Sequence, residues 1–196
     1  QGQASLAEFW PQARRVFPPL AWVLTGRIFM MAALTTYLPI FVSDVREGGL
    51  WLAAASLTIL EAAGMAGALL SGTLSDRLGR KRVLMVLLIL APILMLAFIY
   101  SPTWLAFPLL LLLGFAAISP QPVLLATVQD QFPNNRALGN GTFLALNFLI
   151  RALGIWVVGQ FADSFGLNAA FTTTAVLALI SIPAVFFLPK PRSQTA

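Results

Sequence analysis

Three charged side chains lie inside long apolar runs of this sequence, namely Glu61, Arg27 and Arg151. A charge near the centre of a membrane span costs about 2.5–3.5 kcal/mol on insertion scales, so such a group faces a bundle interior or a water-filled cavity. Glu61 can then form a structural ion pair with an arginine, or it can bind and release a proton. Burial and a nearby arginine act on a carboxyl group in opposite directions, so both roles stay open.

The two arginines differ in their depth within these runs. Arg27 lies about one and a half helical turns inside its run, from where it can snorkel to the lipid headgroups. Arg151 lies about a dozen residues inside, which is too deep for easy snorkelling. Its planar guanidinium matches carboxylate or phosphonate groups, so we expect it to contact an anionic substrate or Glu61. Asn147 lies one turn earlier on the same helix face and extends this polar stripe.

Gln121 and Tyr37 are two further candidates for substrate or coupling contacts. Gln121 belongs to the run Ser119-Pro120-Gln121-Pro122, the strongest local distortion in the sequence. Proline frees backbone carbonyls, which can line a cavity together with Gln121; simple kinking of the helix is the alternative. Tyr37 faces either the same pathway or the membrane interface.

No catalytic constellation accompanies these residues. The sequence contains no Gly-x-Ser-x-Gly turn, no Walker loop and no usefully spaced pair of carboxylates. Histidine and cysteine are absent, which removes thiolate chemistry and metal sites built on those ligands. We therefore expect no enzyme activity, no cofactor and no metal.

Apolar runs of about 20 residues must position the charged groups, and each is long enough to cross a hydrocarbon core of about 30 Å as a helix. Hydrophobic residues make up 59% of the 196 residues and charged residues only 10%, against roughly 25% in soluble domains. Mean hydropathy is +0.86. We therefore expect an all-α integral membrane protein with six transmembrane helices, at residues 21–43, 50–75, 83–100, 104–128, 139–162 and 169–188.

The expected bundle covers residues 21–189 and is flanked by two short segments. Residues 1–20 are expected to form a cytoplasmic, interfacial lead-in, which Pro18-Pro19 separates from the first span. Residues 190–196 are expected to form a cytoplasmic tail. Because the chain begins with Gln1 and not with methionine, we interpret it as a fragment or as the back half of a longer protein.

Basic residues predict the orientation of the bundle. With residues 1–20 in the cytoplasm, nine of the twelve Lys and Arg residues fall in cytoplasmic segments, and only Arg46 falls in an outer connector. This distribution matches the positive-inside rule. The net charge of +5 therefore indicates membrane topology, and we expect no nucleic-acid partner.

A charged turn at residues 72–82 has an uncharged counterpart later in the chain. The pattern G-x-x-S-D-x-L-G at 72–79 recurs as G-x-x-A-D-x-F-G at 159–166, which is 87 residues further on. The two copies end the second and the fifth expected spans, so they lie on opposite membrane faces. We interpret this echo as a 3+3 inverted repeat, an arrangement that recurs in secondary transporters.

The charged turn, G-T-L-S-D-R-L-G-R-K-R, resembles the signature loop of the major facilitator superfamily. The resemblance extends from about residue 22 to residue 189 and implies helices seven to twelve, the C-terminal half of a twelve-helix fold. It implies a cytoplasmic gate in which Asp76 and the basic cluster make contacts between the two halves. The structural alternative is that Asp76 caps the following helix. The gating motif comprises Gly72, Asp76, Arg77, Gly79, Arg80, Lys81 and Arg82.

A narrower similarity lies further along the chain. The run Gln129-Asp130-x-Phe132-Pro133, followed by Gly139-x-Gly141, is similar to bacterial drug-efflux members of the fosmidomycin-resistance type. The resemblance implies a proton-coupled, alternating-access transporter, an efflux antiporter of the bacterial inner membrane. Its expected partners are the lipid bilayer, a proton, an anionic or drug-like small molecule and the missing N-terminal six-helix half. Two alternatives are a non-transporting assembly or regulatory module of the same fold, and a six-span channel.

Overall fold

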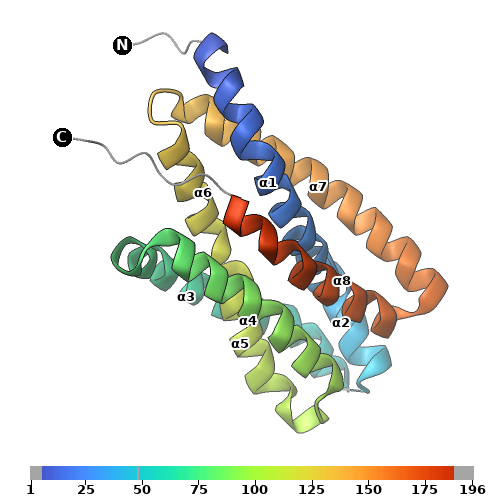
Figure 1. Cartoon of the computed structure of the whole chain (residues 1–196). Coiled ribbons are helices and arrows are strands. Elements are labelled where there is room, and N and C mark those ends of the chain that lie inside the picture. Colours follow the sequence, from blue (N-terminus) through green and yellow to red (C-terminus); the bar gives the residue numbers. More distant parts are fainter. Residues whose placement is uncertain (1–5, 48, 188–196) are drawn as a thin grey trace.

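The computed structural model describes residues 6–47 and 49–187, which form helices joined by short turns and contain no strand (Figure 1). Six helical segments of this part are long and apolar enough to cross a membrane. They are Phe9–Val45, Gly49–Leu78, Arg80–Tyr100, Thr103–Gln131, Arg136–Phe165 and Leu167–Phe187. The expected all-helical, six-span fold class is confirmed. The expected tail at 190–196 lies outside the described residues.

The first span is longer than expected and includes part of the predicted lead-in. Helix α1 (Leu6–Ala32) runs through Pro18 and Pro19, so the break expected there is wrong. A proline inside a helix costs about 3 kcal/mol because it removes one hydrogen bond and crowds a carbonyl. Here Phe9 and Phe17 bury their rings against Phe132, with ring centroids 5.0 and 5.6 Å away. This aromatic packing favours a continuous helix.

The same span ends in an irregular section. After α1 come a π-helical segment η1 (Ala33–Tyr37), a short helix α2 (Leu38–Ile40) and a second π-helical segment η2 (Phe41–Val45). π-Helical turns are rare and occur mostly as local insertions in α-helices, often at functional sites. The first span is therefore α-helical in its N-terminal part and contains two π-helical segments near its C-terminal end.

The remaining spans follow the expected order. Spans two and three are α3 (Gly49–Leu78) and α4 (Arg80–Tyr100), and spans five and six are α7 (Arg136–Phe165) and α8 (Leu167–Ser181), which η4 (Ile182–Phe187) extends. The fourth span consists of η3 (Thr103–Leu105), α5 (Ala106–Ile118) and α6 (Pro120–Gln131). It is interrupted at Ser119, where the sequence predicted a distortion.

Three side chains satisfy backbone carbonyls around this interruption. The Ser119 hydroxyl donates a hydrogen bond to the carbonyl of Phe115. The hydroxyl of Ser71, from α3, donates to the carbonyl of Ser119 over 2.9 Å. Arg27, from α1, donates to the carbonyl of Ala117 over 3.4 Å. Side chains from α1, α3 and the fourth span itself thus satisfy three carbonyls at the interruption, where the regular hydrogen-bond pattern of the helix is disturbed.

The two copies of the repeated pattern form the same type of turn. Gly79 alone separates α3 from α4, and Gly166 alone separates α7 from α8. Their φ angles are 93° and 84°, values that strongly favour glycine. The Gly79 amide donates to the carbonyl of Ser75 over 3.0 Å, and the Gly166 amide donates to that of Ala162 over 2.8 Å. The expected loop from Asp76 to Arg82 is therefore too long, because the helices continue to the glycine on both sides.

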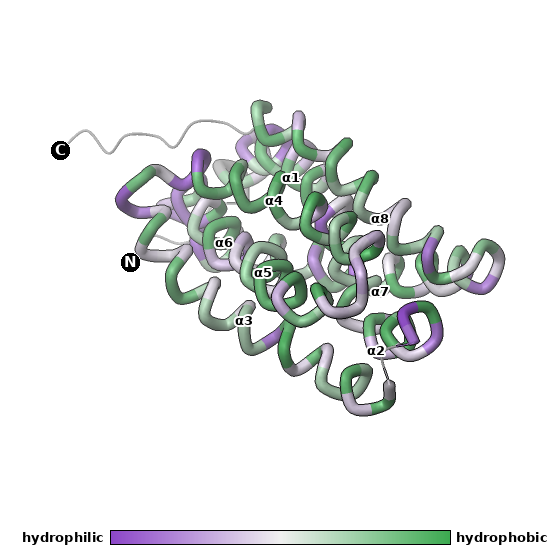
Figure 2. Tube along the Cα trace, turned by 90° about the horizontal axis from the view of Figure 1, so that it is seen from below, coloured by the Kyte–Doolittle hydropathy of each residue, from purple (hydrophilic) through white to green (hydrophobic). Residues whose placement is uncertain are grey.

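Two helices leave most of their surface outside the core. In α7 only 17% of the most apolar stretch is buried, and in α3 only 28%, against 44–50% in the other four spans. The inner side of α3 packs closely on α5, where a Cβ atom on Gly114 would overlap the backbone of Leu60. Hydrophobic residues predominate along the tube of Figure 2, and exposed large apolar side chains lie on both helices, among them Leu69 and Leu74 on α3 and Phe148 and Trp156 on α7. The outer faces of α3 and α7 are thus apolar surfaces without a partner in the described chain.

Candidate functional site

A cavity of about 500 Å³ opens between α1, η1, α3, the α5–α6 junction and α7. Five of the six candidates predicted inside the spans line it: Arg27, Glu61, Gln121, Asn147 and Arg151. They come from four helices that are far apart in the sequence. Apolar side chains complete the wall, among them Met31, Met65, Ile118 and Phe148. This combination of apolar lining and a few converging polar groups is typical of a small-molecule site.

Arg27 points into the bundle and is 5% exposed, so the snorkelling alternative is wrong. Its Nη1 atom donates a hydrogen bond to Oε1 of Gln121 over 2.9 Å. Its Nη2 atom donates to the Ala117 carbonyl at the interruption of the fourth span. Arg27 therefore joins the first span to both sides of that interruption and has an identifiable structural role.

Arg151 is exposed towards the cavity and is only weakly held. Its Nη2 atom donates to Oγ1 of Thr35 in η1 over 3.4 Å. One turn earlier on α7, Nδ2 of Asn147 donates to the carbonyl of Phe143 over 2.9 Å. The guanidinium of Arg151 therefore keeps donors in the cavity that a carboxylate or a phosphonate can accept.

Glu61 projects from α3 on another wall of the cavity and is exposed. Among the described residues, the two ion pairs both involve Arg80, so Glu61 pairs with neither Arg27 nor Arg151. The alternative in which Glu61 forms a structural ion pair with one of these arginines is therefore wrong in this structure. The carboxyl group of Glu61 and the guanidinium of Arg151 line the same cavity without pairing with each other.

Tyr37 does not line the cavity. Its hydroxyl donates to the carbonyl of Ile155 on α7 over 3.3 Å and lies directly against Gly159. Together with the bond between Thr35 and Arg151, this contact attaches η1 to α7. Tyr37 is placed to hold a π-helical segment and not to contact a solute in the cavity.

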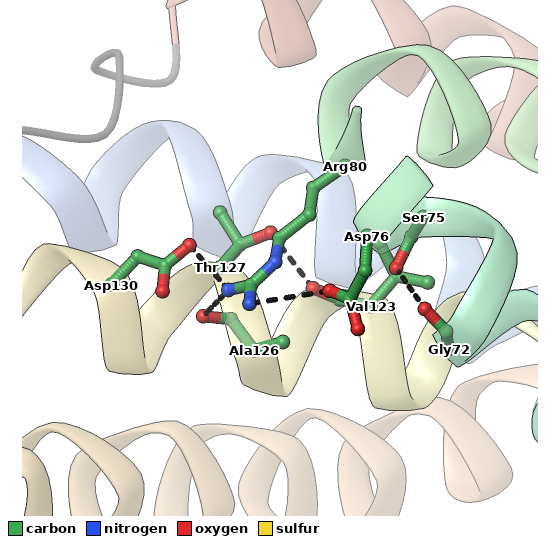
Figure 3. A network of polar contacts seen from close by, with 8 residues as sticks. All are labelled: Gly72, Ser75, Asp76, Arg80, Val123, Ala126, Thr127 and Asp130. Atoms are coloured by element: carbon green, nitrogen blue, oxygen red, sulfur yellow. Dashed lines mark hydrogen bonds and ion pairs between the residues drawn. The ribbon is translucent and has the colours of Figure 1, made fainter. Parts of the chain in front are cut away.

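The gating motif forms a second polar cluster, centred on Arg80 at the start of α4. The Arg80 guanidinium lies 3.6 Å from Asp76 on α3, pairs with Asp130 on α6 and donates to the Ala126 carbonyl over 2.6 Å (Figure 3). Gly79 occupies the cap position of α4, and the Asp76 side chain contacts Arg80, so the structural alternative in which Asp76 caps this helix is not found within the described residues. The cluster ties three helices together at one end of the bundle.

The other motif residues have few contacts within the chain. Lys81 lies 5.5 Å from the ring centroid of Phe186 and donates to its carbonyl over 3.4 Å. Arg77 and Arg82 are exposed, and space around Gly72 is open. The predicted gating contacts would join this motif to the other half of a twelve-helix fold. That half is not part of the chain described here, so the structure does not test them.

Sequence reasoning missed two polar residues with clear contacts. The sequence links Asp130 only to a drug-efflux pattern, whereas in the structure it pairs with Arg80, 50 positions away. Arg46, which the sequence places in an outer connector, is 9% exposed and donates to the Phe98 and Ser101 carbonyls, the latter over 2.7 Å. Burial lowers the pKa of Arg46 below its ordinary value. The sequence shows only that both residues are polar and lie near the end of a span. That position does not indicate which residues they contact.

Six helices that are long and apolar enough to cross a membrane, around a cavity lined by charged side chains, are typical of a multi-pass membrane protein. No group of three His, Cys, Asp or Glu residues suited to a metal occurs in the part of the chain that the structure describes. The family model described as Major Facilitator Superfamily matches residues 1–154 and also residues 57–196. The chain therefore belongs to the major facilitator superfamily, and this membership points to transport rather than catalysis.

Two curated relatives agree with this assignment. The Fosmidomycin resistance protein of Escherichia coli (strain K12) is 26% identical over 175 residues, which are 88% of this chain and 42% of that protein. The Uncharacterized MFS-type transporter YfnC of Bacillus subtilis (strain 168) is 28% identical over 127 residues, which are 65% of this chain and 31% of that protein. The chain thus spans less than half the length of either relative.

Proposed function

We propose that this chain is the C-terminal six-helix half of a secondary transporter that carries a small molecule across a membrane by alternating access. The observation that carries the proposal is the cavity in which Arg27, Glu61 and Arg151 meet between apolar helices. Charged side chains inside a bundle mark substrate or ion pathways, because burying them is costly. Family membership and a relative named as a transporter support the same function.

The missing half would cover the open side of this cavity. Helices α3 and α7 flank the cavity, and their outer faces are the least buried of the six spans. The relatives are more than twice as long as the aligned segments. A partner bundle on α3 and α7 would enclose a solute between two halves, near the middle of the membrane.

Proton-coupled efflux is the finer proposal. The Escherichia coli relative is named for resistance to fosmidomycin, and export of a drug is one way to resist it. Glu61 is the proposed proton site, because its carboxyl group lines the cavity and forms no ion pair with another described residue of this chain. The basic residues Arg77, Lys81 and Arg82 beside Gly79 support a cytoplasmic position for that turn and for both chain ends, in a bacterial inner membrane.

The test uses the full-length protein that contains this chain, reconstituted in vesicles and supplied with fosmidomycin. We expect an opposing pH gradient to accelerate fosmidomycin flux, and Glu61→Gln to remove that acceleration. Glu47→Gln is the matched control, since Glu47 is exposed and lies outside the cavity. Equal flux with and without the pH gradient would refute proton coupling. Absence of flux would favour the non-transporting module.

A further inference from the structure

Building on the proposed function, we propose that the cavity takes a zwitterionic solute, whose anionic group binds Arg151 and whose cationic group binds Glu61 in competition with a proton.

Only one of the two cavity arginines is available to the anionic group. Arg27 is 5% exposed, and its two terminal nitrogens donate to Gln121 and to the Ala117 carbonyl. Its Nε atom has no partner but is buried. Arg151 is exposed and makes a single long hydrogen bond to Thr35. The anionic group of a solute is therefore expected at Arg151, where a bidentate contact is open.

The neutral polar groups of the cavity provide both donors and acceptors. Oε1 of Gln121 accepts the bond from Arg27, which leaves the amide N–H groups of Gln121 as donors. Nδ2 of Asn147 donates to Phe143, which leaves Oδ1 of Asn147 as an acceptor. The acceptors Oδ1 of Asn147 and the carboxylate of Glu61 suit a cationic group.

Charge balance during closure favours a solute that carries both charges. In an exchange of proton for solute, Glu61 has released its proton when the solute is bound. A simple anion would then compensate Arg151 and leave Glu61 charged in a cavity that closes away from water, and a simple amine would leave Arg151 charged. An uncompensated charge in that setting is costly. A zwitterion compensates both residues in one step. Its apolar part can lie against Met31, Met65 and Phe148.

Competition with a proton follows from the surroundings of Glu61. The charged groups that share its cavity are Arg27 on α1 and Arg151 on α7, while α5 and α6 contribute Ile118 and Gln121, which do not titrate. Glu61 can therefore be neutralised by a proton or compensated by the cationic group of the solute, but not by both. Mutual exclusion at one carboxylate is what an exchange of proton for solute requires.

The test compares probes that share a skeleton and differ only in charge. Phenylalanine, 3-phenylpropanoate and 2-phenylethylamine form one series; leucine, 4-methylpentanoate and 3-methylbutylamine form a second. Binding to the purified full-length protein is measured by titration calorimetry at about pH 7, where the amino acids are zwitterionic. In at least one series we expect the zwitterion to bind about tenfold more tightly than the matching anion and the matching amine. The reason is that each additional charge compensated in the cavity should contribute about 1.4 kcal/mol or more to the binding free energy.

Substitutions then assign the charges. Glu61→Gln should reduce zwitterion affinity to that of the matching anion, and Arg151→Gln should reduce it to that of the matching amine. Glu47→Gln and Arg136→Gln carry the same changes at exposed positions outside the cavity and should leave affinity unchanged. Lowering the pH from about 7 to about 4, just below the ordinary glutamate pKa of about 4.3, should weaken zwitterion binding in the wild type and not in Glu61→Gln, which has no carboxyl group to protonate.

The outcomes separate this inference from the proposed function. If the anion binds as tightly as its zwitterion and Arg151→Gln abolishes that binding, the zwitterion inference is wrong and the anion site at Arg151 stands. If no probe binds while fosmidomycin flux persists, the zwitterion inference is wrong and the proposed transport function stands. If neither probe binding nor flux is found, both proposals are wrong.

Discussion

Arg27 and Arg151 show how two identical residues in one cavity acquire different tasks. Arg27 is buried and donates to two acceptors, whereas Arg151 is exposed and makes one long bond. The sequence predicted an inward position for Arg151 and left snorkelling open for Arg27. It could not predict which arginine is engaged, since that depends on which acceptors the folded bundle brings close to each guanidinium.

Substituting each arginine with methionine should therefore separate stability from binding. Arg27→Met leaves the Ala117 carbonyl and Oε1 of Gln121 without a buried donor, and each loss costs about 1–3 kcal/mol. We expect a clear fall in the thermal unfolding temperature of the full-length protein. Arg151→Met should leave that temperature nearly unchanged and reduce probe binding. Equal unfolding temperatures for Arg27→Met and wild type would show that these bonds do not stabilise the fold.

The two carboxylates beside Arg80 should also differ in importance. Asp130 pairs closely with Arg80, and its side chain is 34% exposed, whereas Asp76 lies 3.6 Å away and is 67% exposed. Solvent screening weakens the exposed pair, which contributes about 0–1 kcal/mol. Asp130→Asn should therefore lower the thermal unfolding temperature more than Asp76→Asn. The reverse order would mean that Asp76 has a stronger partner outside this chain.

At the scale of elements, periodic apolar runs predicted every span, but local chemistry misplaced several ends. Pro18 and Pro19 predicted a break that tertiary packing of Phe9 and Phe17 on Phe132 overrides. The charges from Asp76 to Arg82 predicted a loop, yet one glycine suffices to reverse the chain. Contacts such as Arg80 with Asp130 could not be predicted, because they join positions 50 residues apart.

The close packing of α3 on α5, called the seam below, requires a small residue at Gly114. A methyl group on Gly114 would overlap the backbone of Leu60, which cannot move aside like a flexible side chain. We expect Gly114→Ala to destabilise the full-length protein by about 1–3 kcal/mol despite the better helix propensity of alanine. Thermal unfolding in detergent measures this change. Leu112→Ala on the same helix is the control, as Leu112 is 55% exposed; equal effects would show that the seam tolerates a larger residue.

At the scale of the whole molecule, the two glycine turns should lie on opposite sides of the membrane. The chain contains no cysteine, so single cysteines at Arg82→Cys and Asn168→Cys mark the two turns without other thiols in this half. An impermeant maleimide should label Arg82→Cys only from the cytoplasmic side and Asn168→Cys only from the outside, as the basic residues direct. Labelling of both positions from the same side would contradict the inverted repeat.

The interruption of the fourth span has a consequence for how well the protein insulates the membrane. Carbonyls around Ser119 receive hydrogen bonds from Ser71, Arg27 and Ser119 itself, so none of these needs a water molecule. A bend hydrated by a file of waters would offer protons a conducting path through the helix. Because side chains occupy three of the carbonyls at this bend, fewer acceptors are left there for a file of waters, and we expect the interruption to add little to the passive proton conductance of the membrane.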